Sequence, residues 1–167
     1  MQEQDNEDEK SQRVLQDYYD IVVEDVLGSY YSDKEYIVLF PRVINACAKS
    51  LNVSYDALYD VVLAHETAHA VTHRCMSDES YTWKAFLYAT TESKELLAQL
   101  IPFVYFERQE ISSCQEAIEA LSHHQRPKYT AYKSHPAVSG NKNALRDLVL
   151  HIRQEQESLS RKLTDFG

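Results

Sequence analysis

Apolar residues recur at helical spacing along most of this 167-residue chain, and the pattern predicts a mainly helical protein. A first helix is expected from Val14 to the neighbourhood of Gly28. Further helices are expected at 41–50, 54–74, 90–104, 113–124 and 143–163. Pro102 lies inside the segment 90–104, where its ring would either kink the helix or end it.

A small β-sheet is expected beside these helices. Residues 35–40 form a short apolar run before a proline and make the best strand, and residues 28–31 can pair with them as a hairpin. Residues 125–141 contain two prolines and a glycine, which is typical of a long ordered loop. The expected fold class is therefore mainly α (α+β), a single helical domain over residues 11–167 with at most a small two- or three-stranded sheet.

Charge and cysteine content restrict the partners and the cellular compartment expected for this domain. The net charge is -9, and residues 1–10 carry five acids and one lysine, which is typical of a disordered acidic tail. No basic patch occurs, so nucleic acid is not an expected partner. The three cysteines are far apart and include no Cys-x-x-Cys, which suits a reducing compartment. The start is acidic where a signal peptide would be basic, and no apolar run reaches about 20 residues, so a cytoplasmic protein without a membrane segment is expected.

The segment 54–74 carries a chemical pattern, His65-Glu66-Thr67-Ala68-His69, inside an uncharged and apolar stretch. Histidines four residues apart stand on one face of a helix and can hold one zinc ion together. The glutamate between them then faces a metal-bound water, an arrangement that generates a nucleophile for hydrolysing amides. The alternative is a hydrogen-bonded pair of core histidines with a surface glutamate. The metal site is favoured because two imidazoles and a carboxylate are costly to bury without a partner.

A catalytic zinc needs a third protein ligand, which the motif itself does not supply. His73 lies one turn beyond His69, roughly 12 Å along the axis from His65, so the three cannot converge on one ion from an unbroken helix. Glu95 is the better candidate, because it stands on the next and largely apolar helix, where a carboxylate needs a cation or a donor. The alternatives on that helix are Glu92 and, after it, Glu107.

The motif segment 63–73, followed by a glutamate on a later helix, resembles the gluzincin branch of the zinc-dependent metallopeptidases. It is also similar to small cytoplasmic zincins of the ImmA/IrrE type, over about residues 54–102. The resemblance implies a zincin-like helical domain with Zn2+ as its cofactor, held by His65, His69 and Glu95. It also implies that Glu66 is the general base, which takes a proton from the metal-bound water and passes it to the leaving amine.

A peptidase also needs a donor for the oxyanion, commonly a tyrosine or a histidine. His73 is a candidate substrate contact at the end of the motif helix, and the loop 125–141 is the best candidate for the far wall of the site. The candidates in or beside that loop are His123, His124, Tyr129, Tyr132 and His135. The strand 35–40 can bind an extended peptide if its edge is exposed.

Three functions compete on this sequence. The predicted function is a zinc-dependent metallopeptidase that hydrolyses peptide bonds of a peptide or protein substrate in the cytoplasm. The alternative is a non-catalytic zinc-binding regulatory or protein-interaction module with a vestigial site, in which a fourth side chain such as His73 fills the open metal position. The third is a metal-free helical interaction protein, in which His65→Ala leaves stability unchanged with and without chelator. The substrate and the oligomeric state do not follow from the sequence.

Overall fold

The computed structural model describes residues 27–74, 89–125, 130–138, 143–152 and 154. Within these residues the protein is mainly helical with a small antiparallel sheet, which confirms the predicted fold class. The acidic tail 1–10 and the helix predicted from Val14 lie outside the described residues. None of the helices in the described part is long and apolar enough to cross a membrane.

The sheet is a hairpin of β1 (Gly28–Tyr31) and β2 (Tyr36–Leu39), close to the two predicted strands. The strands are antiparallel, with Gly28 opposite Leu39 at one end and Tyr31 opposite Tyr36 at the other. The two tyrosine rings stack with their centroids 4.9 Å apart. Such cross-strand aromatic pairs stabilise a short ladder next to its turn.

Helix α2 spans Pro41–Leu51 and helix α3 spans Tyr55–Arg74, both within a residue of the predicted bounds. Helix α2 begins at a proline. Proline is well tolerated there, because the N–H groups of the first turn have no intrahelical acceptor. Asn52 ends α2 in the left-handed conformation. The Ser54 hydroxyl accepts the Ala57 N–H in the first turn of α3, so Ser54 caps the motif helix.

Helix α4 spans Thr91–Arg108. Thr90 is its N-cap, and the Thr90 side chain accepts the Ser93 N–H at 3.2 Å. Pro102 does not end the helix, which continues to Arg108. The proline is buried, and packing of the helix in the core outweighs the loss of one backbone hydrogen bond.

The remaining described elements are α5 (Ser112–Ser122), the short 3-10 helix η2 (Ala131–Ser134) and a helix over 144–152. Helix α5 agrees with the predicted 113–124. The helix over 144–152 occupies the first half of the predicted last helix, and residues 155–163 of that prediction lie outside the described part. Element η2 interrupts the predicted long loop with one helical turn.

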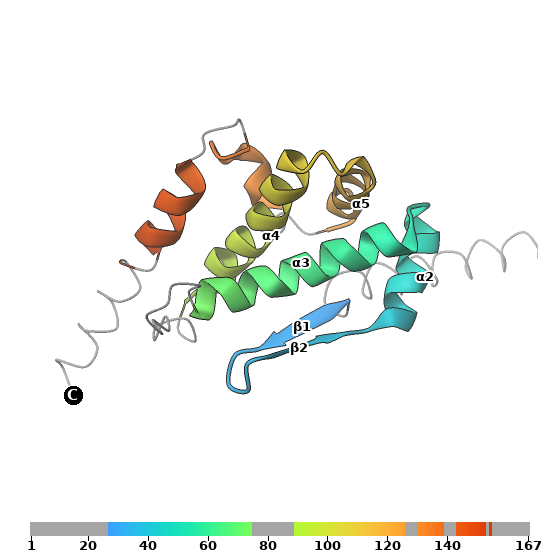
Figure 1. Ribbon diagram of the computed structural model, residues 1–167, viewed down its shortest axis with the longest axis horizontal. Coiled ribbons are helices and arrows are strands. Elements are labelled where there is room, and N and C mark those ends of the chain that lie inside the picture. Colours follow the sequence, from blue (N-terminus) through green and yellow to red (C-terminus); the bar gives the residue numbers. More distant parts are fainter. Residues whose placement is uncertain (1–26, 75–88, 126–129, 139–142, 153, 155–167) are drawn as a thin grey trace, which may run out of the picture.

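Helix α3 lies at the centre of the fold (Figure 1). The hairpin lies along one side of α3, and α4 and α5 lie on the other, while α2 packs near its beginning. Buried residues of α3 include Leu58, Val61, Val62 and Ala68, so the motif helix is central and largely buried. Leu63 is the exception, because 39% of its surface is exposed. Elements packed on two sides of a helix still leave a stripe of it in solvent.

Candidate metal centre

Three of the predicted metal ligands meet between α3 and α4. His65 and His69 stand one turn apart on α3, with their rings edge to face and the centroids 4.8 Å apart. Glu95, in the second turn of α4, faces both rings: its Oε2 lies 3.4 Å from His65 Nε2 and its Oε1 lies 3.7 Å from His69 Nε2. One ligand atom of each residue lies within 4.8 Å of the other two.

The spacing of this metal group, His65, His69 and Glu95, fits a small metal ion. Donor atoms around a tetrahedral zinc ion with bonds of about 2.1 Å stand about 3.4 Å apart, close to the separations of the glutamate oxygens from the imidazole nitrogens. Two imidazoles and one carboxylate are also a donor set that zinc takes in hydrolytic sites. The three side chains keep between 12% and 18% of their surface exposed, so solvent reaches them. The group could therefore hold a metal ion.

The lowered pKa of His69 favours the neutral imidazole, which is the form that binds a metal. Burial, reinforced by the neighbouring His65 and opposed by Glu95, lowers the pKa of His69 from 6.5 to about 4. The imidazole is therefore neutral at neutral pH. Since a metal binds only the neutral form, no proton has to be displaced from this ligand first.

Glu66 lies beside the metal group and is buried, with 6% of its surface exposed. Burial raises the pKa of this carboxyl, the charge of His65 lowers it, the charge of Glu95 raises it, and a hydrogen bond from the Tyr30 backbone N–H lowers it. The alternative of a surface glutamate between two core histidines is therefore wrong. A buried carboxyl with a raised pKa instead takes up a proton more readily than a solvated glutamate does.

His73 is not a member of the metal group. It is buried near the end of α3, where its Nδ1 lies 2.9 Å from the hydroxyl of Tyr30 on β1. The two rings meet edge on, with centroids 5.9 Å apart. Helix α3 is unbroken from His65 to His73, which is the condition that keeps both from binding one ion. The next residue, Arg74, forms an ion pair with Glu35 in the turn of the hairpin.

The two other glutamates that were weighed as ligands lie elsewhere on α4. Glu92 is exposed in the first turn, where an acid suits the helix dipole, and Glu107 is exposed at the far end. Neither belongs to the metal group found among the described residues. Glu95 follows Glu92 by three residues, so the two side chains point in directions about 60° apart around the helix axis. The packing of α4 on α3 turns Glu95, and not Glu92, toward the histidines.

Two predicted far-wall residues lie in the described part of the segment 125–141. Tyr132 on η2 is 1% exposed and packs on Phe103 of α4, with ring centroids 5.3 Å apart. Burial, with a smaller contribution from Glu119, raises the pKa of the Tyr132 hydroxyl to about 12. His135 follows η2, and its Nδ1 accepts the N–H of Ala137 at 3.2 Å. These contacts make Tyr132 a core residue and give no support to a substrate role for either residue.

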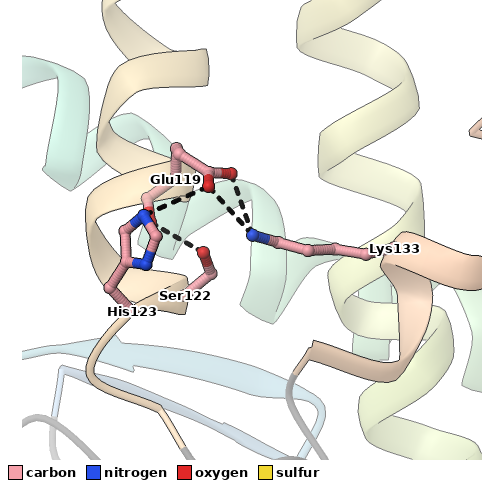
Figure 2. Close-up of polar contacts among 4 residues, drawn as sticks. All are labelled: Glu119, Ser122, His123 and Lys133. Atoms are coloured by element: carbon pink, nitrogen blue, oxygen red, sulfur yellow. Dashed lines mark hydrogen bonds and ion pairs between the residues drawn. The ribbon is translucent and has the colours of Figure 1, made fainter.

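The histidines at the end of α5 lie at the surface. In Figure 2, His123 and Lys133 of η2 both approach the carboxylate of Glu119. His123 Nε2 lies 3.2 Å from Glu119 Oε1, and Lys133 Nζ lies 3.0 Å from Oε1 and 2.9 Å from Oε2. This ion cluster joins η2 to α5. His124 is also exposed, and Tyr129 lies outside the described residues. A role for any of the three as an oxyanion donor stays a prediction.

Tyr30 is the residue beside the site that the sequence pattern does not reveal. It contacts Glu66 through its backbone and His73 through its hydroxyl. The pattern predicts its strand, but the contact with His73 joins residues 43 positions apart in the chain. Neither helical nor strand periodicity carries information on how a hairpin packs on a helix.

Comparison of the chain with models of known families, with curated proteins and with solved structures gives no match. The functional inference therefore rests on the geometry of the side chains described above. Those side chains are two imidazoles, a carboxylate facing both of them, and a second, buried carboxyl on the same helix as the imidazoles.

Proposed function

We propose that this protein is a zinc-dependent metallopeptidase of the gluzincin type, similar to small cytoplasmic zincins of the ImmA/IrrE type. One observation carries the proposal: His65, His69 and Glu95 converge with the spacing of a metal site, and the buried Glu66 lies beside them. Three protein ligands are typical of a catalytic zinc, which leaves the fourth position for water or substrate. A structural zinc site has no need of a buried carboxyl next to its ligands.

In this proposal Glu66 transfers the proton during hydrolysis. A zinc ion held by the metal group would polarise the scissile carbonyl and lower the pKa of a coordinated water. Glu66 takes a proton from the attacking water as the water oxygen bonds to the carbonyl carbon. It then delivers that proton to the amine nitrogen as the C–N bond breaks. Burial raises the pKa of Glu66, so the protonated form that the second step needs becomes easier to reach near neutral pH.

The proposed substrate is a peptide or a protein, and the proposed compartment is the cytoplasm. Within the described part of the chain, Cys47 and Cys114 are buried thiols and not half of a disulfide, as is usual in a reducing compartment. The strand β2, which is expected to bind an extended peptide, lies at an edge of the two-stranded sheet. These features support the proposal without identifying a substrate sequence.

The proposal is tested by measuring zinc content and peptide cleavage with the full chain. Purified protein is expected to hold about one zinc per chain and to cleave members of a peptide library, with cleavage lost after chelation and restored by zinc. Glu66→Gln is expected to keep the zinc and lower kcat about 10²- to 10⁴-fold, because it removes the general base. Glu107→Gln, a change at an exposed glutamate of α4, is the matched control and is expected to leave both quantities unchanged.

Three outcomes would defeat the peptidase. Zinc bound at full stoichiometry without cleavage would favour the non-catalytic zinc-binding module. Cleavage that survives Glu66→Gln would show that the observed activity does not use the proposed general base. A chain that binds no zinc would favour the metal-free interaction protein. The module would be supported further by a fourth side-chain ligand, but His73, the candidate for that role, does not belong to the metal group.

A further inference from the structure

Strand β1 lies against the part of α3 that carries Glu66. A Cβ added at Gly28 would lie 2.9 Å from Glu66 Cγ, closer than real Cβ atoms approach another atom. The backbone N–H of Tyr30 donates a hydrogen bond to the Glu66 carboxylate. Alternate residues of a strand share a face, so Gly28 and Tyr30 stand on the same side of β1. The Glu66 side chain therefore lies against β1, close to Gly28 and bonded to the Tyr30 N–H.

Two polar contacts and one apolar contact fix β1 in this place. The Tyr30 hydroxyl lies 2.9 Å from His73 Nδ1, and Glu35, in the turn that follows β1, pairs with Arg74. Both partners belong to the last turn of α3, about two turns beyond Glu66. The Tyr30 ring also packs against a small core cluster formed by Ala89, Leu97 and Ile152. The hairpin is therefore held on the same helix whose glutamate it contacts.

We propose that β1 positions the Glu66 carboxylate. Gly28 leaves the space that the side chain occupies, the Tyr30 N–H orients its oxygens, and the Tyr30–His73 contact keeps the strand against α3. These residues are positioning residues, because they act through Glu66 and do not belong to the metal group. The consequence for rate rests on the proposed peptidase function, whereas the contact between β1 and Glu66 does not.

The physical reason for such a device is the freedom of a glutamate side chain. Glu66 has rotatable bonds that let its carboxylate turn away from an attacking water, and a misplacement of about 1 Å at a catalytic group costs on the order of 10²-fold in rate. A backbone donor on a strand fixed at several points is more rigid than a donor on a mobile side chain. A strand without a Cβ at position 28 allows this close approach.

Gly28→Ala tests the contact through stability, without reference to activity. The added methyl group meets Glu66 Cγ and Leu39 Cδ2 at 2.9 Å and Val62 Cγ1 at 3.0 Å, so Tm is expected to fall. In a Glu66→Ala background the Cγ atom is absent, and the loss of Tm is expected to be smaller by about 2–4 °C. Ser29→Ala, on the other face of β1, is the matched control and is expected to cost the same in both backgrounds. An equal loss for Gly28→Ala in the two backgrounds would overturn the proposal.

Tyr30→Phe is the second variant, and it decides the question if Gly28→Ala does not fold. It keeps the ring in its apolar cluster and removes the hydroxyl that contacts His73. Its loss of Tm is likewise expected to be smaller in the Glu66→Ala background. With a cleaved peptide, kcat is expected to fall about five- to tenfold while KM and zinc content stay unchanged. An unchanged kcat, or a KM that rises by the same factor as kcat falls, would show that the contact supports the fold and does not position the base.

The two proposals fail in different ways. A chain that binds zinc and cleaves no peptide would defeat the peptidase, but the Tm comparison would still decide whether β1 positions Glu66. A chain that cleaves peptides and shows additive Tm losses for Gly28→Ala and for Tyr30→Phe would keep the peptidase and defeat the positioning role of β1.

Discussion

Burial shifts the pKa values of His69 and Glu66, two nearby residues of α3, in opposite directions. Burial disfavours the charged form of both. For His69 this lowers the pKa to about 4 and leaves a neutral imidazole, the form that binds a metal. For Glu66 it raises the pKa, so the carboxyl takes up a proton more readily than a solvated glutamate does. The hydrogen bond from the Tyr30 N–H limits this rise, since it favours the carboxylate.

The lowered pKa of His69 predicts that acid destabilises the metal-free protein. The unfolded chain takes up this proton near pH 6.5, but the folded chain does so only near pH 4. The stabilising contribution of neutral His69 is therefore complete above pH 6.5 and is lost as the pH falls through about 4. The whole effect is on the order of 3 kcal/mol in the free energy of unfolding.

This acid effect is measured by urea unfolding with a chelator at several pH values between 7 and 4. The measurement is best made on Glu66→Gln protein, because the raised pKa of Glu66 has the opposite effect on stability, which falls as the pH rises through the titration of that carboxyl. In this background His69→Gln is expected to flatten the pH dependence. A slope as steep with glutamine as with histidine at position 69 would refute the assignment.

Among the elements, α3 is the one that the sequence predicts best and β1 the one whose role it predicts least. The common face of His65 and His69 follows from helical spacing alone, which is a local property. The choice of Glu95 over Glu92 required knowledge of the side of α4 that packs on α3, and the apolar neighbours of Glu95 carried part of it. The contact of β1 with Glu66 depends on a backbone N–H, which every residue but proline offers, so no residue type marks it.

Pro102 on α4 and Tyr132 on η2 are two positions where packing in the core, and not the local sequence, determines the structure. The rule for proline inside a helix allows either a kink or an end, and the buried Pro102 is followed by helix as far as Arg108. Tyr132, predicted from its place in a loop to face a substrate, is instead covered by the core, where it packs on Phe103. In both cases the number of apolar neighbours that the fold supplies decided the outcome, and that number cannot be derived from a stretch of sequence taken alone.

The start of α4 gives a prediction at this scale, because Thr90 caps the helix that carries Glu95. Thr90→Ala removes the acceptor for the Ser93 N–H and is expected to cost about 1 kcal/mol of stability, or roughly 2–4 °C in Tm. Thr91→Ala is the matched control, since this neighbouring threonine lies inside the first turn and is exposed. Thermal unfolding of both variants makes the comparison. Equal losses for the two threonines would show that the cap does not stabilise α4.

For the whole molecule, the important property is that α3 serves the core and the metal group at once. Leu58 and Val62 belong to the main hydrophobic core, and His65 and His69 of the same helix face Glu95 on α4. A metal ion in this group would join α3 to α4, the two helices that pack most closely at the centre of the fold (Figure 1). Metal binding should therefore be coupled to the stability of the entire domain, and not only to activity.

Zinc is accordingly expected to raise the stability of the folded chain. At a free zinc concentration 100 times Kd the gain is about 2.7 kcal/mol, or roughly 5–10 °C in Tm, because zinc binds the folded state in preference to the unfolded one. Thermal unfolding with zinc and with a chelator measures the difference. Glu95→Gln is expected to lose most of the gain in Tm, since Glu95 is the metal-group residue on α4. Glu92→Gln changes an exposed glutamate three residues earlier on the same helix and is expected to keep the gain. A gain that Glu95→Gln retains in full would mean that zinc binds without joining α3 to α4, and a gain lost equally in Glu92→Gln would place the third ligand at Glu92.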